Sequence, residues 1–147
     1  MTFMRSQSDR QLTVAMIVYT IQTRLLYVMT KIEVKRVYDD PAGTYDGYRI
    51  YIDRLWPRGE SKEKFHYDLW DKDIAPSTEL RKWFHEDPDG RWDDFKARYN
   101  KELEMSASAD ELLCKIKGLS LVTLLYSSRD HEHNNAQVLA DYLRSKL

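Results

Sequence analysis

The segment Leu119–Tyr126 constrains the fold of this chain more than any other. Its sequence, LSLVTLLY, is nearly all apolar, and it lies between Gly118 and the polar segment Ser127–Asp130. A strand with apolar side chains on both faces must be covered on both faces, as in the parallel sheets of α/β proteins. We therefore predict a sheet that contains this strand at a buried position.

Strand and helix patterns alternate along the rest of the chain. Strands are predicted at Lys31–Val37, where polar and apolar residues alternate, at Tyr48–Asp53 and, more weakly, around Phe65–Leu69. Helices are predicted to start at Ser77, Asp87, a capping box at Ser108–Glu111, and His131. This alternation predicts an α/β fold: one three-layer-like domain with a small parallel or mixed sheet covered by helices.

The first 28 residues differ in composition from the rest. The chain has 147 residues and a mass of 17.5 kDa, which is enough for one ordinary domain. Residues 1–28 carry three arginines and one aspartate, and their apolar run Leu12–Tyr19 is shorter than a membrane span. We interpret residues 1–28 as an extension upstream of a start at Met29, and residues 29–147 as a single α/β domain. A signal sequence or an interfacial helix is the alternative.

Composition excludes several classes of protein. The formal net charge of −1 does not favour attraction of the whole surface to nucleic acid or membrane. The single cysteine, Cys114, allows no disulfide within the chain and predicts a cytoplasmic protein. Its apolar neighbours predict that Cys114 is a small buried side chain. The common nucleotide-binding motifs are absent, so no cofactor is expected.

Two charged segments follow predicted strands and form the candidate site. Asp53-Arg-Leu-Trp-Pro-Arg-Gly59 follows the second strand, and Tyr126–Asn135 follows the last strand and leads into a helix. Ligands of open α/β sheets bind at the carboxyl ends of strands, and guanidinium groups suit phosphate or carboxylate. We predict an arginine-lined anion pocket whose candidate ligand-binding residues are Arg54, Trp56, Arg58, Arg81, Ser127, Ser128, Arg129 and Asn134.

Histidine and aspartate side chains in the same segments suit proton transfer. His133 is the candidate general acid or base, with Asp53 or Asp130 as its partner or as an orienting group for an arginine. His131 and His133 are two positions apart, which is a poor spacing for two ligands on one helix face. We therefore predict no metal site.

Structural roles for the same residues remain open. Arg54 and Arg58 can form ion pairs with Asp53, Asp71 or Asp73 and so hold the loops in place. Ser127 or Asp130 can cap the last helix.

The same segments resemble a known family. Arg49–Gly59, Trp70–Ser77, Leu80–Phe84, Leu124–Asp130 and Glu132–Asn134 closely resemble the domain-of-unknown-function family 488, in its YeaO-like group. The resemblance runs from about Ile32 to Leu143 and implies a small cytoplasmic α/β protein without an assigned reaction. By resemblance, the motif positions fall on Asp53, Arg54, Trp56, Pro57, Arg58, Ser77, Arg81, Arg129, Asp130, His133 and Asn134. The acidic residue usual at position 131 is replaced here by His131.

Three functions follow from these observations. The first is a cytoplasmic protein with an arginine-lined anion pocket for a small phosphorylated or nucleotide-like ligand, in which an enzymatic role is left open. The second is a non-catalytic module in which the same arginines and Trp56 bind single-stranded nucleic acid or a partner protein. The third is a regulatory accessory protein in which the motif residues are purely structural.

Overall fold

The computed structural model describes residues 6–25 and 29–147, in which a first helix is followed by three strands, a group of helices, a fourth strand and a last helix. The elements in chain order are α1 (Gln7–Leu25), β1 (Lys31–Arg36), β2 (Tyr48–Tyr51), β3 (Leu69–Trp70), the short 3₁₀ helix η1 (Lys72–Ile74), α2 (Thr78–Glu86), α3 (Pro88–Glu104), α4 (Ala107–Ile116), β4 (Leu121–Tyr126) and α5 (Asn135–Lys146).

The four strands form one parallel sheet in the order β1-β4-β2-β3. The last strand in sequence, β4, lies between β1 and β2, with Leu124 opposite Val34 on one side and Ile50 on the other. Its five residues from Val122 to Tyr126 are buried, as the apolar run predicts. The predicted α/β class and small sheet are confirmed.

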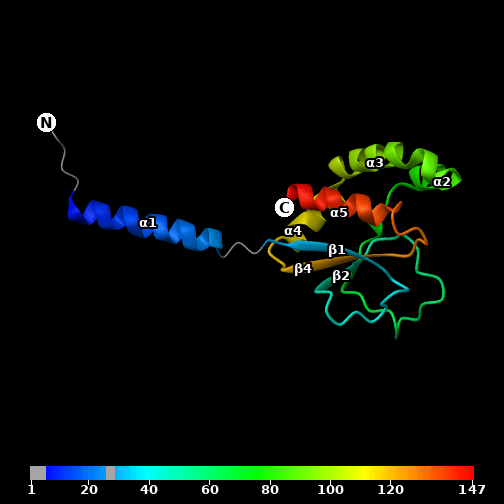
Figure 1. The fold of residues 1–147 in the computed structure, drawn as a ribbon, viewed down its shortest axis with the longest axis horizontal. Coiled ribbons are helices and arrows are strands. Elements are labelled where there is room, and N and C mark those ends of the chain that lie inside the picture. The colour runs from blue at the N-terminus through cyan, green and yellow to red at the C-terminus, as the bar shows by residue number, and fades with distance from the viewer. Residues whose placement is uncertain (1–5, 26–28) are drawn as a thin grey trace.

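Helices cover only one face of this sheet (Figure 1). On that face, α5 contacts β1 and β4, and α3 packs on α5 and α2. The other face is covered by the irregular connections after β1 and β2, where an aromatic cluster packs on Tyr51 and Leu125. The cluster residues are Trp56, Phe65, Tyr67 and Trp70. The third layer is therefore a layer of loops, and not of helices.

A buried ion pair anchors the connection between β1 and β2. Arg49 of β2 is 1% exposed and donates to the carboxylate of Asp46 at 2.9 Å. The Nη2 atom of Arg49 also donates to the backbone oxygens of Asp40 and Pro41. Because Arg49 contacts both ends of this connection, the loop is held against the sheet.

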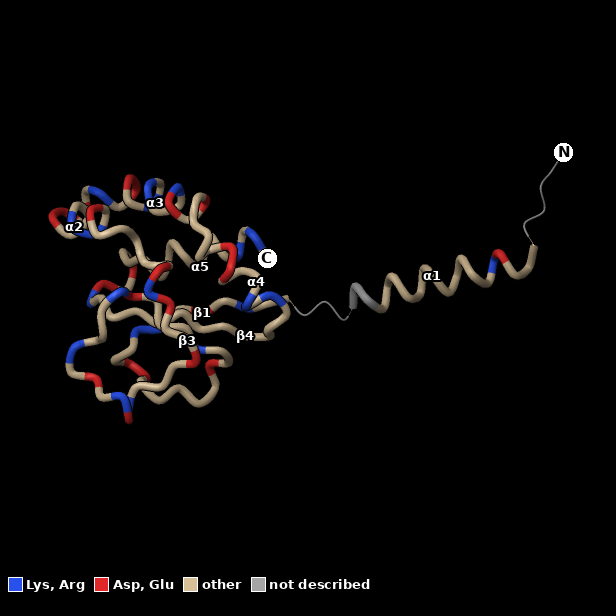
Figure 2. The backbone as a smooth tube through the Cα atoms, turned by 180° about the vertical axis from the view of Figure 1, so that it is seen from behind, with Lys and Arg blue, Asp and Glu red and all other residues tan. Residues whose placement is uncertain are grey.

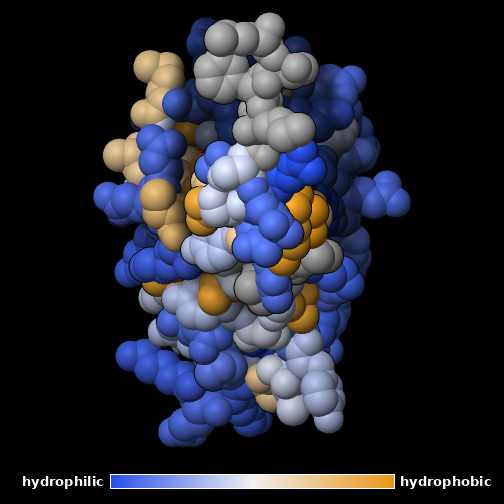
Figure 3. All heavy atoms as spheres, turned by 90° about the vertical axis from the view of Figure 1, so that its left-hand side faces the viewer, coloured by the Kyte–Doolittle hydropathy of each residue, from blue (hydrophilic) through white to orange (hydrophobic). Residues whose placement is uncertain are grey.

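Helix α1 extends away from the sheet, as is seen from the front (Figure 1) and from behind (Figure 2). All its described side chains, from Gln7 to Gln22, are exposed, and they include Leu12, Met16 and Tyr19. Hydrophobic side chains are visible at the surface on this side of the molecule (Figure 3). Among the described residues, no helix has the length and apolar character needed to cross a membrane. The assignment of residues 1–28 as an extension stays a prediction, and residues 1–5 and 26–28 lie outside the described part.

Three local predictions are wrong. Cys114 is exposed, because α4 turns its apolar face inward through Leu112 and Ile116. The N-cap of α4 is Ser106, two residues before the predicted capping box, and its hydroxyl accepts from the N–H of Ala109. The last helix begins at Asn135 instead of His131, because the backbone from Asp130 onward first forms a turn around the Asp130 carboxylate.

Candidate anion-binding site

The carboxyl ends of β1, β2 and β4 lie at one edge of the sheet. Parallel pairing aligns Arg36, at the end of β1, with Tyr126, at the end of β4. On the other side of β4, Tyr51 at the end of β2 pairs with Leu125. The segments that follow the three strands therefore start side by side, which is the geometry that the candidate site requires (Figure 1).

Asp53 joins the β2 segment to the β4 segment. Its Oδ2 atom accepts from both the backbone N–H of Ser127 at 2.8 Å and the hydroxyl of Ser127 at 2.6 Å. Its Oδ1 atom accepts from the side-chain amide of Asn135 at 3.0 Å. The carboxylate therefore has two donors from the segment after β4 and one from the start of α5, which gives Asp53 a structural role in holding the segments together.

Two residues of β1 and its flank connect the same segments on the other side. The Nε atom of Arg36 donates to the backbone oxygen of Ser128 at 2.8 Å, and its guanidinium lies 4.7 Å from the ring centroid of Tyr38. The hydroxyl of Tyr38 donates to the backbone oxygen of Arg58 at 2.8 Å. The sequence did not predict a role for either residue. Arg36 ends a strand and Tyr38 follows it, and only the order of the strands in the sheet shows which segments they contact.

The predicted arginines of these segments are exposed. Arg58 lies in a tight turn in which the N–H of Glu60 bonds to the oxygen of Pro57, and Gly59 provides the positive φ of 81°. Arg54 and Arg129 are also exposed. Within residues 6–25 and 29–147, none of these three guanidinium groups forms an ion pair, so the pairing with Asp71 or Asp73 is not found.

The two serines after β4 differ in what they can offer a ligand. The hydroxyl hydrogen of Ser127 is used, since it is donated to Asp53. The hydroxyl of Ser128 instead accepts from the N–H of Asp130 at 3.3 Å, so its own hydrogen is available to a ligand. Of the two candidates, Ser128 is therefore the donor that suits an anion.

Asp130 and His133 form a second polar cluster with Asp89 of α3. The Nδ1 atom of His133 lies 3.2 Å from Asp89 Oδ1 and 3.5 Å from Asp130 Oδ2. The other oxygen of Asp130 accepts from the N–H groups of Glu132 and His133, both at 2.9 Å. These bonds, that of His133 first, lower the pKa of Asp130 and keep it ionised.

This second cluster also has the composition of a weak cation site. The ligand atoms of Asp89, Asp130 and His133 lie within 4.8 Å of one another. His131 does not join them, because its Nδ1 atom lies 3.1 Å from the hydroxyl of Tyr126. The two histidines are therefore directed to different partners, as their spacing suggests.

The remaining candidates lie in different surroundings. Trp56 donates to the oxygen of Glu60 at 2.8 Å, and its ring packs in the aromatic layer under the sheet. Asn134 is 2% exposed and caps α5, accepting from the N–H of Gln137 and donating to the oxygen of Asp130. Arg81 is exposed on α2.

The fold and the loops at the carboxyl ends of the strands define a class of protein. Its members are single-domain α/β proteins in which a parallel four-stranded sheet carries hydrogen-bonded loops and exposed arginines at that edge. The chain belongs to the DUF488 family, since residues 31–147 match the family model described as the inactive DUF488-N3 subclade. The resemblance seen in the sequence is thereby confirmed.

Two relatives illustrate the extent of the similarity. The chain is 48% identical to the uncharacterised protein YeaO of Escherichia coli K12 over 114 residues, which cover 78% of this chain and 97% of YeaO. It is 42% identical to the uncharacterised protein Rv3073c of Mycobacterium tuberculosis H37Rv over 117 residues, which cover 80% of this chain and 97% of that protein. No solved structure gives a significant match.

Proposed function

We propose that this protein binds a small phosphorylated or nucleotide-like ligand, without catalysis, at the carboxyl edge of its sheet. The ligand-binding groups are the guanidinium groups of Arg54, Arg58 and Arg129, together with the hydroxyl of Ser128. The observation that carries the proposal is that these arginines extend from hydrogen-bonded loops and have no acidic partner among the described residues. One guanidinium group can bind two oxygens of a phosphate at once, through two parallel N–H···O hydrogen bonds.

The surroundings of the site favour binding over chemistry. The matching family model is described as inactive, and this description, applied to the present chain, favours a receptor. Asp53 is occupied by three donors from Ser127 and Asn135, so it is a poor acceptor for a substrate proton. His133 stays outside the proposal as a catalyst, since its Nδ1 atom is directed to two carboxylates of its own cluster.

The nucleic-acid alternative has less support. Base stacking requires an open aromatic face, whereas the ring of Trp56 contacts Phe65, Tyr67 and Trp70. The chain also carries a formal net charge of −1, which provides no general attraction to a polyanion.

Ligand-dependent stabilisation tests the proposal. Phosphate, pyrophosphate, AMP and ADP are added to the full chain, and the melting temperature is measured by differential scanning fluorimetry. At least one of the four compounds is expected to raise the melting temperature of the wild type and to raise that of Arg58→Ala or Arg129→Ala much less. A shift of equal size in the wild type and in both variants would show that the arginines do not bind the anion.

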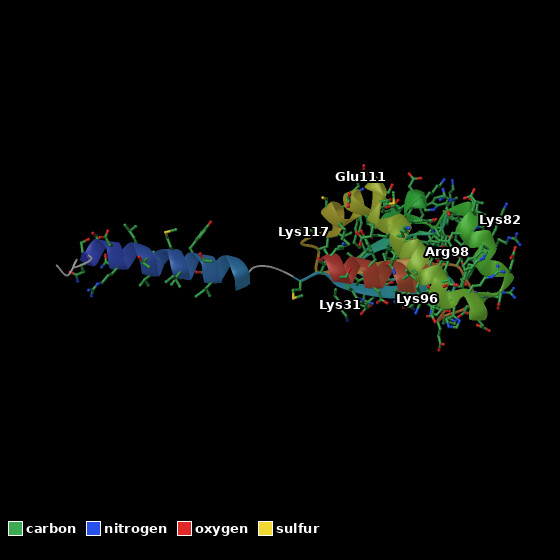
Figure 4. The ribbon with its side chains drawn as sticks, turned by 90° about the horizontal axis from the view of Figure 1, so that it is seen from above. Lys31, Lys82, Lys96, Arg98, Glu111 and Lys117 are labelled. Atoms are coloured by element: carbon green, nitrogen blue, oxygen red, sulfur yellow. The ribbon has the colours of Figure 1, made fainter. Side chains whose placement is uncertain are left out.

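A matched control removes a positive charge elsewhere. Lys117 lies beyond α4, at the end of the sheet where the strands begin, near Lys31 (Figure 4). Lys117→Ala is therefore expected to keep the full shift. If Lys117→Ala reduced the ligand-induced rise in melting temperature as much as Arg58→Ala and Arg129→Ala do, the ligand would be attracted by net charge alone. A single-stranded oligonucleotide that binds more tightly than all four compounds would favour the nucleic-acid alternative.

A further inference from the structure

We propose that Tyr38 and Arg36 are positioning residues that hold Arg58 and Arg129 in the arrangement needed to bind one anion. This inference rests on the proposed function and assigns a role to two residues outside the candidate motifs. Neither residue is proposed to touch the ligand. Each acts on the backbone of an arginine-bearing segment.

The contacts form a continuous connection between the two segments. It begins at the oxygen of Arg58, which accepts from the hydroxyl of Tyr38. The ring of Tyr38 then lies against the guanidinium of Arg36, at 4.7 Å from the ring centroid. Arg36 in turn donates to the oxygen of Ser128, the residue before Arg129. The backbone of Arg58 is therefore linked to the backbone next to Arg129 through the end of β1.

Strand β1 makes this connection rigid. Arg36 pairs with Tyr126 in the parallel ladder, and the N–H of Val37 bonds to the oxygen of Tyr126. Tyr38 follows directly, so the connection starts from a backbone that the sheet already orders. The turn at Arg58 has two short-range bonds of its own, from the N–H of Glu60 to the oxygen of Pro57 and from the indole of Trp56 to the oxygen of Glu60. Tyr38 adds a hydrogen bond that links this turn to the end of β1.

Pre-ordering of the two arginines has a direct effect on affinity. A ligand that binds two separate loops must otherwise immobilise them, and this entropic cost weakens binding. The connection removes part of that cost before the ligand arrives. Loss of the Tyr38 hydroxyl should therefore weaken binding without removing any group that contacts the anion.

The test is a double-mutant cycle on the full chain. Pyrophosphate affinity is measured by isothermal titration calorimetry for the wild type, Tyr38→Phe, Arg58→Ala and the double variant. Phenylalanine keeps the ring against Arg36 and removes only the hydroxyl. Tyr38→Phe is expected to bind pyrophosphate about fivefold more weakly than the wild type, because the ligand must then order the turn at Arg58 itself. In the Arg58→Ala background, the same change is expected to have no effect, because Tyr38 acts through Arg58.

Two controls separate a positioning role from a general structural one. Tyr45 is 90% exposed in the loop before β2, so Tyr45→Phe should bind pyrophosphate as the wild type does. Arg36→Lys keeps a positive charge but loses the planar contact with Tyr38, and it should weaken binding as Tyr38→Phe does. Melting temperatures of all variants are recorded. Tyr45→Phe should melt as the wild type does, whereas Tyr38→Phe should melt a few degrees lower, because it loses one hydrogen bond of the folded protein.

The outcomes distinguish the inference from the proposed function. If Arg58→Ala weakens pyrophosphate binding and Tyr38→Phe does not, the positioning role is wrong and the anion site stands. If Tyr38→Phe weakens binding equally with and without Arg58, Tyr38 acts by another route and the inference also fails. If the wild type does not bind pyrophosphate, the site does not join both arginines on one anion, and the inference is overturned.

Discussion

The carboxylate of Asp53 accepts two hydrogen bonds from Ser127, a residue 74 positions later in the chain. This pair joins the ends of β2 and β4, and the amide of Asn135 adds the start of α5 to the same carboxylate. The two segments that the sequence predicts to form one site therefore meet through a carboxylate. The exposed arginines of both segments are left without an ion pair in the described part of the chain.

Asp53→Asn should lower the free energy of unfolding by about 2–3 kcal/mol, because hydrogen bonds to a charged acceptor are strong and an asparagine amide would face a donor. Urea denaturation measures this change. Asp94, exposed on α3, provides the control, since Asp94→Asn should change the free energy of unfolding by less than about 0.5 kcal/mol. A similar small change in both variants would contradict the structural role of Asp53.

Gly43→Ala should be more destabilising than Gly118→Ala, although both glycines have a positive φ, of 51° and 88°. A Cβ at Gly43 would lie 1.1 Å from the Nη1 atom of Arg49, whereas at Gly118 it would meet nothing within 4 Å. We expect losses of about 3 kcal/mol and about 1 kcal/mol, since only Gly43→Ala displaces a buried, paired guanidinium. Thermal unfolding of the two variants gives the comparison, and equal losses would refute it.

The contribution of Asp130 to stability should depend on pH. Its pKa is lowered from 3.8 in the folded protein by the N–H groups of His133 and Glu132, so the folded state favours the ionised carboxylate. The resulting stabilisation is fully present above pH 3.8 and is lost as the pH falls through the lower, folded-state value. Asp130→Asn should therefore be less stable than the wild type at pH 7, with a smaller difference near pH 3. A difference independent of pH would exclude this origin.

Asn134→Ala should destabilise the protein by about 1–2 kcal/mol, because the side chain caps α5 and is buried. Asn134→Asp should cost less, since an aspartate keeps the acceptor for the N–H of Gln137. Guanidinium chloride denaturation compares the two variants. If Asn134→Asp were less stable than Asn134→Ala, the hydrogen bond that the Asn134 amide donates to the backbone oxygen of Asp130 would be the dominant contact.

A chain that begins at Met29 should unfold within about 2 °C of the full chain, because the described side chains of α1 are exposed. Differential scanning calorimetry of the two chains measures the difference. An insoluble shorter chain, or one that melts well below the full chain, would show that residues 1–28 are part of the domain.

The sequence alone determined most of the strands and helices of the α/β domain, although not all of their ends. The apolar run before Ser127 predicts a buried strand, and both faces of β4 are indeed covered. Ser77 and Asp87 predict helix starts, and each side chain does accept a hydrogen bond from a backbone N–H in the first turn of its helix. These signals are local: a strand has a period of two, and a cap is formed within one turn of helix. The loop with Asp53 and Arg58 was predicted from residue types alone.

Only the tertiary structure decided how these parts meet. The order β1-β4-β2-β3 places Arg36 beside Ser128, which is 92 residues away in the sequence, and this brings the end of β1 to the candidate site. The same packing leaves Cys114 exposed and covers the second face of the sheet with aromatic loops. Contacts of this kind depend on the relative positions of strands distant in the sequence, for which neither periodicity nor composition carries a local signal.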